Sequence, residues 1–406
     1  MIRSSCLVCG SDNLKQIIDL GCHPFADTFI SEAKISEPDV IYPLVCELCE
    51  NCGHVQTKYA TDPMLRYAHT EYSYTSSNSA YSRKHWDEFA KEASDELKIK
   101  PNALIVEAGS NDGYLLEQFL KNGQKVIGVD PSPNMAALAR ERNVESIMSL
   151  FDNKTAEQIL EKHGKADLVI ANNTFNHVDN IMEFMDAVAK ILRDDGSFIF
   201  EQPYWLSGVK NGKFDLIYHE HVNYFTVRSI SALLARVGMM IKSVKIVDYH
   251  GDSLRVTAQK KSQVSQEPEE VKKMIKDEEE HGIFKADSYK EFMQRILKQR
   301  NKFMQKVHKL KEEGKTIIAV GAATKGNTFL NFYKLDKSLI DYVTDASPLK
   351  KGKYTPGTRI PIVGDEIFTK YDSPYALILT WNMAAVLKEK LIPFNKNIQF
   401  LVPEDL

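Results

Sequence analysis

Short apolar runs alternate with amphipathic stretches through the middle of the chain. The apolar runs predict buried strands at residues 103–107, 125–130, 166–171 and 196–201. The amphipathic stretches predict helices at residues 80–97, 114–122, 134–141 and 181–192. In the first of these helices Trp86, Phe89 and Ala93 fall on one face. Apolar strands that alternate with helices are typical of a parallel, doubly wound sheet.

The pattern changes near residue 266. From there to about residue 311 charged residues are dense but the periodicity stays helical, which predicts a long solvated helix or a helix pair. The alternation then restarts, with strands expected at residues 316–320, 340–344 and 375–380. A glycine-bearing loop and a helix follow the first of these strands. We therefore expect an α/β fold with a second, smaller Rossmann-like domain at the C-terminus.

Composition narrows the class of protein. The chain of 406 residues is 43% hydrophobic and 26% charged, as in soluble globular proteins, and is too long for one ordinary core. A net charge of -3 gives no basic surface for nucleic acid. No apolar run approaches the roughly 18 residues of a membrane span, and the N-terminus lacks the apolar stretch of a signal peptide. We expect a cytoplasmic protein.

All six cysteines lie within the first 52 residues: Cys6, Cys9, Cys22, Cys46, Cys49 and Cys52. Two pairs with Cys-x-x-Cys spacing, Cys6 with Cys9 and Cys49 with Cys52, predict a structural zinc site of four thiolates. Cys46 is a rival ligand, because its spacing to Cys49 fits equally well. Cys52 is preferred because Gly53 permits a tight turn behind the metal. Buried thiols or a redox pair are the other interpretations.

A strand followed by a glycine-bearing loop and a helix predicts a cofactor site. The loop runs Glu107-Ala-Gly109-Ser-Asn111-Asp112-Gly113, and its backbone N–H groups would surround a ligand. The G-x-G-x-x-G pattern of dinucleotide sites is absent, which disfavours NAD. The observed spacing resembles the first motif of class I S-adenosylmethionine methyltransferases. An ordinary tight turn is the alternative.

Three further residues, at the ends of two strands, support this cofactor site. The second strand ends in Asp130, 23 residues after Glu107, where a carboxylate can accept both hydroxyls of a ribose. Asn172 and Asn173 follow the next strand and are expected to line the same cleft, unless they only cap that strand.

The segment Tyr218-His219-Glu220-His221-Val-Asn-Tyr224-Phe225 concentrates groups for acid–base chemistry. A metal site is disfavoured because the histidine spacing is neither H-x-x-x-H nor H-E-x-x-H. A neutral imidazole is a suitable base near pH 7, and Glu220 could orient it or carry a proton. Two structural histidines in a loop are the alternative.

Several motifs in order identify the chain as similar to the sugar C-methyltransferases of deoxysugar biosynthesis. They are the two cysteine pairs, residues 109–113, 218–225, 250–255, 321–327 and 352–358. The resemblance covers nearly the whole length. Cys46 and Asp252 depart from the family pattern, the latter where a second glycine is expected. The resemblance implies a zinc-binding module at residues 1–70, a methyltransferase domain at 71–262 and a Rossmann-like domain at 263–406.

The resemblance also implies a reaction. The C4 ketone of a nucleotide-diphosphate-linked sugar acidifies C3, a base forms the enolate, and C3 attacks the methyl group of S-adenosylmethionine. Carried over to this chain, His221 is the base, with Glu220 and Tyr218 as support or proton relay. Tyr74, with Tyr72 as the alternative, lies over the sugar.

The substrate is expected to contact five residues: Tyr72, Tyr224, Arg255, Lys325 and Lys353. The two lysines are expected at the diphosphate, although either could be a solvated surface residue. We expect a monomer or weak homo-oligomer that binds neither nucleic acid nor membrane. An O- or N-methyltransferase of a small molecule, and a zinc-dependent scaffold with a decayed enzyme core, are the rival functions.

Overall fold

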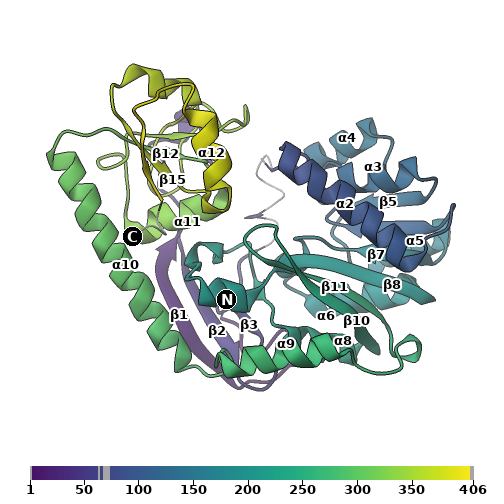
Figure 1. Ribbon diagram of the computed structural model, residues 1–406. Coiled ribbons are helices and arrows are strands. Elements are labelled where there is room, and N and C mark those ends of the chain that lie inside the picture. The colour runs from purple at the N-terminus through teal and green to yellow at the C-terminus, as the bar shows by residue number, and fades with distance from the viewer. Residues whose placement is uncertain (1, 63–64, 67–73, 403–406) are drawn as a thin grey trace.

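The structure is a computed structural model that describes residues 2–62, 65–66 and 74–402. The strands of the described residues form a four-stranded, a seven-stranded and a five-stranded sheet (Figure 1). Tyr72, one of the predicted substrate contacts, lies outside the described residues. None of the described helices combines the length and apolar character that a membrane crossing requires.

The seven-stranded sheet carries the predicted central domain. Its strands are β4 (Leu104–Ala108), β5 (Lys125–Val129), β6 (Glu145–Ile147), β7 (Ala166–Ile170), β8 (Leu192–Pro203), β10 (Met239–Val247) and β11 (Ser253–Lys260). Their order is β10-β11-β8-β7-β4-β5-β6. The helices of this part are α2 (Ala80–Leu97), α3 (Tyr114–Lys121), α4 (Pro133–Glu141), α5 (Asn153–His163), α6 (Ile181–Ile191), α7 (Trp205–Lys210) and α8 (Val227–Arg236).

The four predicted strands pair in parallel, and the sheet continues into an antiparallel edge that was not predicted from the sequence. Strands β4 to β8 pair in parallel, but β11 runs antiparallel to both β8 and β10. The reason is the connection: the short loop at residues 248–252 permits a hairpin, whereas a parallel neighbour needs a crossover of about a dozen residues. The parallel part is buried as predicted, with Ile105 and Val106 fully enclosed.

The chain order reverses at β4, which lies between β5 and β7. Such a reversal opens a crevice at the carboxyl ends of the strands, where α/β proteins bind ligands. The 3-10 turn Phe175–His177 follows β7 at this edge. The polar residues predicted for the cofactor therefore meet at one end of the sheet.

The four-stranded sheet has the order β1 (Leu14–His23), β2 (Tyr42–Cys49), β3 (Val55–Thr57) and β9 (Asn223–Tyr224). All three pairings are antiparallel. Its last strand belongs to the segment that carries His221, so the sheet of the cysteine module includes a strand from far along the chain. A 3-10 turn, Glu32–Lys34, lies between β1 and β2.

The charged stretch after residue 266 is a helix pair, α9 (Glu269–Glu280) and α10 (Ser288–Glu312). In Figure 1, α10 runs along the outside of the molecule past β1 to the C-terminal sheet. That sheet is parallel, in the order β14 (Ile362–Val363), β13 (Tyr342–Thr344), β12 (Ile317–Val320), β15 (Tyr375–Ile378) and β16 (Gln399–Leu401). Its helices are α11 (Thr324–Tyr333) and α12 (Ala384–Leu391).

Candidate active site

A cavity of about 330 Å³ lies at the carboxyl edge of the central sheet. This volume is within the range of small-molecule sites. Its wall includes these predicted residues: Tyr74, Glu107, Gly109, Asn111, Asp130, Asn172 and Asn173. The structure thus brings most of the predicted cofactor residues around one space.

The loop after β4 has the shape that its sequence suggests. Gly109 has φ 73°, and a Cβ there would lie 1.9 Å from Oγ1 of Thr174, so only glycine fits. Asn111 Oδ1 accepts a hydrogen bond from the Ser76 backbone N–H at 2.8 Å, and its Nδ2 donates to the Tyr74 carbonyl at 3.2 Å. The chain at residues 74–76 is therefore held over the loop.

Asp112 and Gly113 do not line the cavity. Asp112 is buried and accepts hydrogen bonds from the hydroxyls of Ser76 and Ser77. Gly113 is the N-cap of α3, where its φ of 74° suits glycine. Both residues therefore stabilise the shape of the loop and do not face the cavity.

Two buried carboxylates face the cavity. Asp130 accepts backbone hydrogen bonds from Asn111 and Ser132, each at 2.9 Å, which fixes its orientation after β5. Glu107 is 5% exposed, and its Oε2 has no hydrogen-bond partner among the described residues. Burial raises the pKa of Glu107 well above its usual value, and Asp112 and Asp130 add to the shift. A buried acid of this kind suits a cationic ligand.

His221 is buried beside a tyrosine. Its Nδ1 donates to the Leu216 carbonyl at 2.9 Å, so the lone pair lies on Nε2, which accepts a hydrogen bond from the Tyr218 hydroxyl. Burial lowers the pKa of His221 well below its usual value, and His177 adds to the shift. The imidazole is therefore neutral near pH 7, and its free electron pair is connected to a phenol.

Glu220 points away from His221. Its Oε1 accepts the Asp27 backbone N–H at 3.3 Å, and burial raises the pKa of Glu220 to about 7. His219 contacts the Tyr42 carbonyl at 3.2 Å, and burial lowers its pKa to about 4. Both side chains therefore face the N-terminal module, and of the predicted supporting pair only Tyr218 touches the imidazole.

Sequence reasoning missed His177. It lies between His221 and the cavity at the carboxyl edge of the sheet, which we call the cofactor cavity because most of the predicted cofactor residues line it. The His177 ring lines the cavity and lies 4.9 Å from the His221 ring, nearly perpendicular to it. Burial lowers the pKa of His177 to about 3, so it too is neutral. His177 follows β7 within a few residues, as Asn172 does. This position in the sequence could have indicated that it lies at the carboxyl edge of the sheet.

Two predicted substrate residues have other neighbours. Tyr224 packs behind His221, against Trp205, and neither it nor Arg255 lines the cofactor cavity. The guanidinium of Arg255 forms ion pairs with Glu92 and Glu201. Arg255 therefore connects α2 to the sheet, and its charge is paired with carboxylates of the protein itself.

A pair of lysines meets where the central and C-terminal parts touch. Lys213 and Lys325 lie 3.7 and 4.3 Å from the ring of Trp381, whose indole N–H donates to Asp215 at 2.6 Å. Burial lowers the pKa of each lysine to about 8, and the Asp215 carboxylate opposes that shift. The backbone of Lys353 is hydrogen-bonded to Ile362 of β14 at 2.8 Å and to Lys350 at 3.1 Å.

The loop at residues 250–252, which packs against Trp381, has a strained backbone. His250, Gly251 and Asp252 all have positive φ, of 56°, 82° and 72°. A Cβ on Gly251 would lie 2.3 Å from the Trp381 ring, which explains the glycine. Burial lowers the pKa of His250 to about 3, and both Lys325 and His221 contribute. The loop thus packs against the same ring, Trp381, that Lys325 faces.

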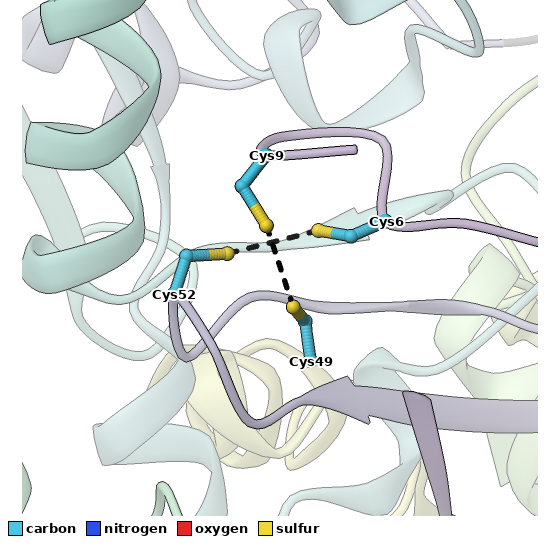
Figure 2. A group of neighbouring side chains, drawn as sticks. All are labelled: Cys6, Cys9, Cys49 and Cys52. Atoms are coloured by element: carbon cyan, nitrogen blue, oxygen red, sulfur yellow. Dashed lines mark hydrogen bonds between the residues drawn. The ribbon is translucent and has the colours of Figure 1, made fainter. Parts of the chain in front are cut away.

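Four thiols converge in the N-terminal module (Figure 2). The sulfur atoms of Cys6, Cys9, Cys49 and Cys52 all lie within 4.8 Å of one another, and two of the distances are 3.7 and 3.5 Å. Zinc–sulfur bonds of about 2.3 Å in a tetrahedron place the sulfur atoms about 3.8 Å apart, so the set fits zinc. Cys46 is a separate buried thiol outside this cluster, so the structure groups the preferred pair, Cys49 and Cys52, with Cys6 and Cys9.

Comparison with known proteins finds similar families for each of the three parts of the chain. Three family models match: "Putative zinc binding domain" at residues 6–67, "Methyltransferase domain" at 79–244 and "C-methyltransferase C-terminal domain" at 248–403. The C-methyltransferase NovU of Streptomyces niveus is 32% identical over 98% of this chain and 94% of its own length. A ubiquinone biosynthesis O-methyltransferase of Bartonella bacilliformis is 30% identical, but over only 25% of this chain and 42% of its own.

Solved structures are similar over less of the chain. The magnesium protoporphyrin IX methyltransferase of Synechocystis with bound SAM has 16% identity and a TM-score of 0.33, and the match covers 44% of this chain and 79% of that one. An S-adenosylmethionine-dependent methyltransferase of Clostridium acetobutylicum has 16% identity and a TM-score of 0.36, over 45% and 93%.

The chain has the three parts of a zinc-containing methyltransferase, and its similarity to NovU runs from end to end. It belongs to the C-methyltransferase family. It is a methyltransferase, and its N-terminal module binds zinc.

Glu107 gives a pH-dependent prediction for cofactor binding. Because burial raises the Glu107 pKa in the free protein, the carboxyl binds a proton at lower pH, and a cationic cofactor must displace that proton. Affinity for S-adenosylmethionine should therefore fall as the pH falls through this pKa, with up to about one proton released per cofactor bound.

Calorimetry in buffers of different ionisation enthalpy measures the released proton. Glu107→Gln should abolish the release, whereas Glu117→Gln, on α3 and outside the cavity, should preserve it. Affinity and proton release that do not depend on Glu107 would contradict the assignment.

Proposed function

We propose that the enzyme transfers a methyl group from S-adenosylmethionine to C3 of a nucleotide-diphosphate-linked 4-keto-deoxysugar, in the biosynthesis of a branched-chain sugar. The observation that carries the proposal is the buried, neutral His221, whose Nε2 is joined to the Tyr218 hydroxyl next to the cofactor cavity. Similarity to a C-methyltransferase supports it, because a carbon nucleophile must first be formed by removing a proton.

The first step is enolate formation. The C4 ketone acidifies C3–H, and the proton passes to the His221 Nε2 directly or through the Tyr218 hydroxyl, which moves its own proton to the imidazole. The Leu216 carbonyl holds Nδ1–H and fixes the tautomer that leaves Nε2 free to accept. When bound, the cofactor supplies the methyl group that C3 attacks.

Burial affects this base in two ways. It keeps His221 unprotonated near pH 7, but it also weakens the imidazole as a proton acceptor. The anionic diphosphate and the developing enolate would stabilise the imidazolium and raise its pKa once substrate is bound. His177, also neutral and on the cavity wall, is a second candidate base that the sequence did not suggest.

The residues proposed to hold the cofactor line one cavity. Asp130 would accept the ribose hydroxyls, and Glu107 would face the positive charge of the amino acid end. Asn172 and Asn173, at the end of β7, complete the same wall. Tyr74 lies above the loop, where its ring can cover cofactor or sugar.

The lysine pair at Trp381 is the proposed diphosphate site. Lys213 and Lys325 bring two ammonium groups to the ring of Trp381, where Asp215 accepts from the indole N–H and Lys325 donates to the side-chain oxygen of Asn382. A diphosphate at this place would pair with both ammonium groups. The loop that carries His250 packs against Trp381, because a Cβ on Gly251 would lie 2.3 Å from that ring.

Removal of one ammonium group from this site should weaken substrate binding. Lys325→Met keeps an apolar stem against Trp381 but loses the charge, so KM for the nucleotide sugar should rise about 10-fold or more. Cofactor affinity should be unchanged. Lys337→Met, which removes an exposed lysine of the same domain, is the control. Equal KM values in steady-state kinetics of the two variants would place the diphosphate elsewhere.

A panel of nucleotide-linked 4-keto sugars tests the proposed function. The enzyme should methylate at least one member on carbon and should exchange its C3 proton for deuterium even without cofactor. The position of the methyl group and of the deuterium is determined by NMR. Methylation on oxygen or nitrogen without C3 exchange would replace this function with that of an O- or N-methyltransferase.

A further inference from the structure

The strand that leaves the zinc site is hydrogen-bonded to the chain that carries His221. β3 begins shortly after Cys52 and pairs with β9, so that Gln56 lies opposite Asn223. The backbone N–H of Thr57 also donates to the residue that follows His221, at 2.9 Å. The zinc module therefore fixes the backbone on the C-terminal side of the proposed base.

The Asn223 side chain extends this connection to a third segment. It is 1% exposed; its Oδ1 lies 3.0 Å from Nε2 of His54, and its Nδ2 donates to the Val178 carbonyl at 2.7 Å. Because Oδ1 can only accept, His54 Nε2 is the donor. One amide thus joins the zinc module, the chain after His221 and the loop after β7.

In that loop, the residues before and after His177 each have a carbonyl that accepts a hydrogen bond from the segment after His221. The Val222 backbone N–H donates to the Asn176 carbonyl at 2.9 Å, and Asn223 holds the Val178 carbonyl. These two hydrogen bonds bracket His177 and set its ring 4.9 Å from the His221 ring. Asn223 itself does not line the cofactor cavity.

We propose that Asn223, oriented by His54 of the zinc module, is a positioning residue that holds His177 and the cofactor-site wall against His221. The proposal rests on the proposed function, because the step it should affect is proton removal at C3. A buried amide that loses a partner leaves a polar group unsatisfied, which the loop relieves by moving. Movement of about 1 Å at a reacting centre costs about 100-fold in rate.

Three variants separate positioning from stability. Asn223→Ala removes both contacts, and His54→Leu removes the donor that orients the amide. His54→Gln supplies a new N–H donor and should restore most of the lost activity. Asn331→Ala is the matched control, since the Asn331 amide also donates to two carbonyls, at 2.8 and 3.0 Å, but within the C-terminal domain.

Zinc content, cofactor affinity and KM should stay near wild type in Asn223→Ala and His54→Leu. Turnover and C3 exchange should both fall by about 10-fold to 100-fold. The imidazole 15N resonances of His177 and His221 should shift in these variants but not in Asn331→Ala. This last measurement needs no substrate, so it still tests the positioning if the wild-type enzyme methylates no keto sugar and the proposed function fails.

Two outcomes would overturn the proposal. Wild-type turnover of folded Asn223→Ala at a reduced melting temperature would show that the amide only stabilises the fold. Equal losses in His54→Leu and His54→Gln, together with loss of zinc, would show that His54 serves the metal module and does not orient Asn223.

Discussion

His221→Asn is expected to lower turnover by about 100-fold or more, the range for loss of a general base. Asparagine keeps part of the size and hydrogen bonding of the imidazole, so cofactor and substrate affinities should change little. C3 deuterium exchange should fall by the same factor, because proton removal precedes methyl transfer in the proposed reaction. Rapid-quench turnover and NMR detection of exchange measure the two steps.

The variant His163→Asn, on α5 and outside the cofactor cavity, is the control and should keep wild-type rates. Exchange that persists in His221→Asn while methylation is lost would transfer the role of base to another residue. The first to test would be His177, which lines the cavity, followed by Tyr74 and His219. Persistence of both reactions would disprove the proposed mechanism.

Zinc removal is expected to have the second large effect, because four thiolates close the coordination sphere and zinc binding contributes folding free energy. Purified protein should contain about one zinc per chain. Cys49→Ser and Cys52→Ser should lose most of the metal and melt at least about 10 °C lower. Activity should fall with them, since β3 lies in one sheet with β9 next to the proposed base.

Cys22→Ser is the matched control, because Cys22 is exposed and outside the cluster. It should keep its zinc and melting temperature. Metal analysis, calorimetry and turnover are measured on the same samples. A protein that remains fully active and equally stable after complete removal of the metal would contradict a structural role for zinc.

Local features of the sequence were enough to predict the main elements and the cofactor. The zinc ligands are recognisable because two cysteines separated by two residues can bind one ion whatever surrounds them. The loop from Glu107 to Gly113 is recognisable because glycine conformations and a strand-to-helix turn are encoded within a few residues. Asp130 belongs to the same pattern, since parallel strands end at one edge of the sheet.

The direction in which side chains point could not be read in this way. Glu220 is next to His221 in sequence, but the bend of the segment turns it toward Asp27. Asp112 lies in the cofactor loop, yet it binds the hydroxyls of Ser76 and Ser77. In irregular backbone no fixed period tells which neighbour faces the site, so adjacent residues can serve different structures.

The sequence by itself determined an α/β methyltransferase with a zinc module, because strand, helix and ligand patterns are properties of short segments. Only the tertiary structure decided what meets at the proposed active site. His177 reaches His221, Lys213 shares Trp381 with Lys325, and β9 completes the zinc module's sheet. These contacts join residues far apart along the chain, and they depend on sheet register and domain packing, which no local pattern specifies.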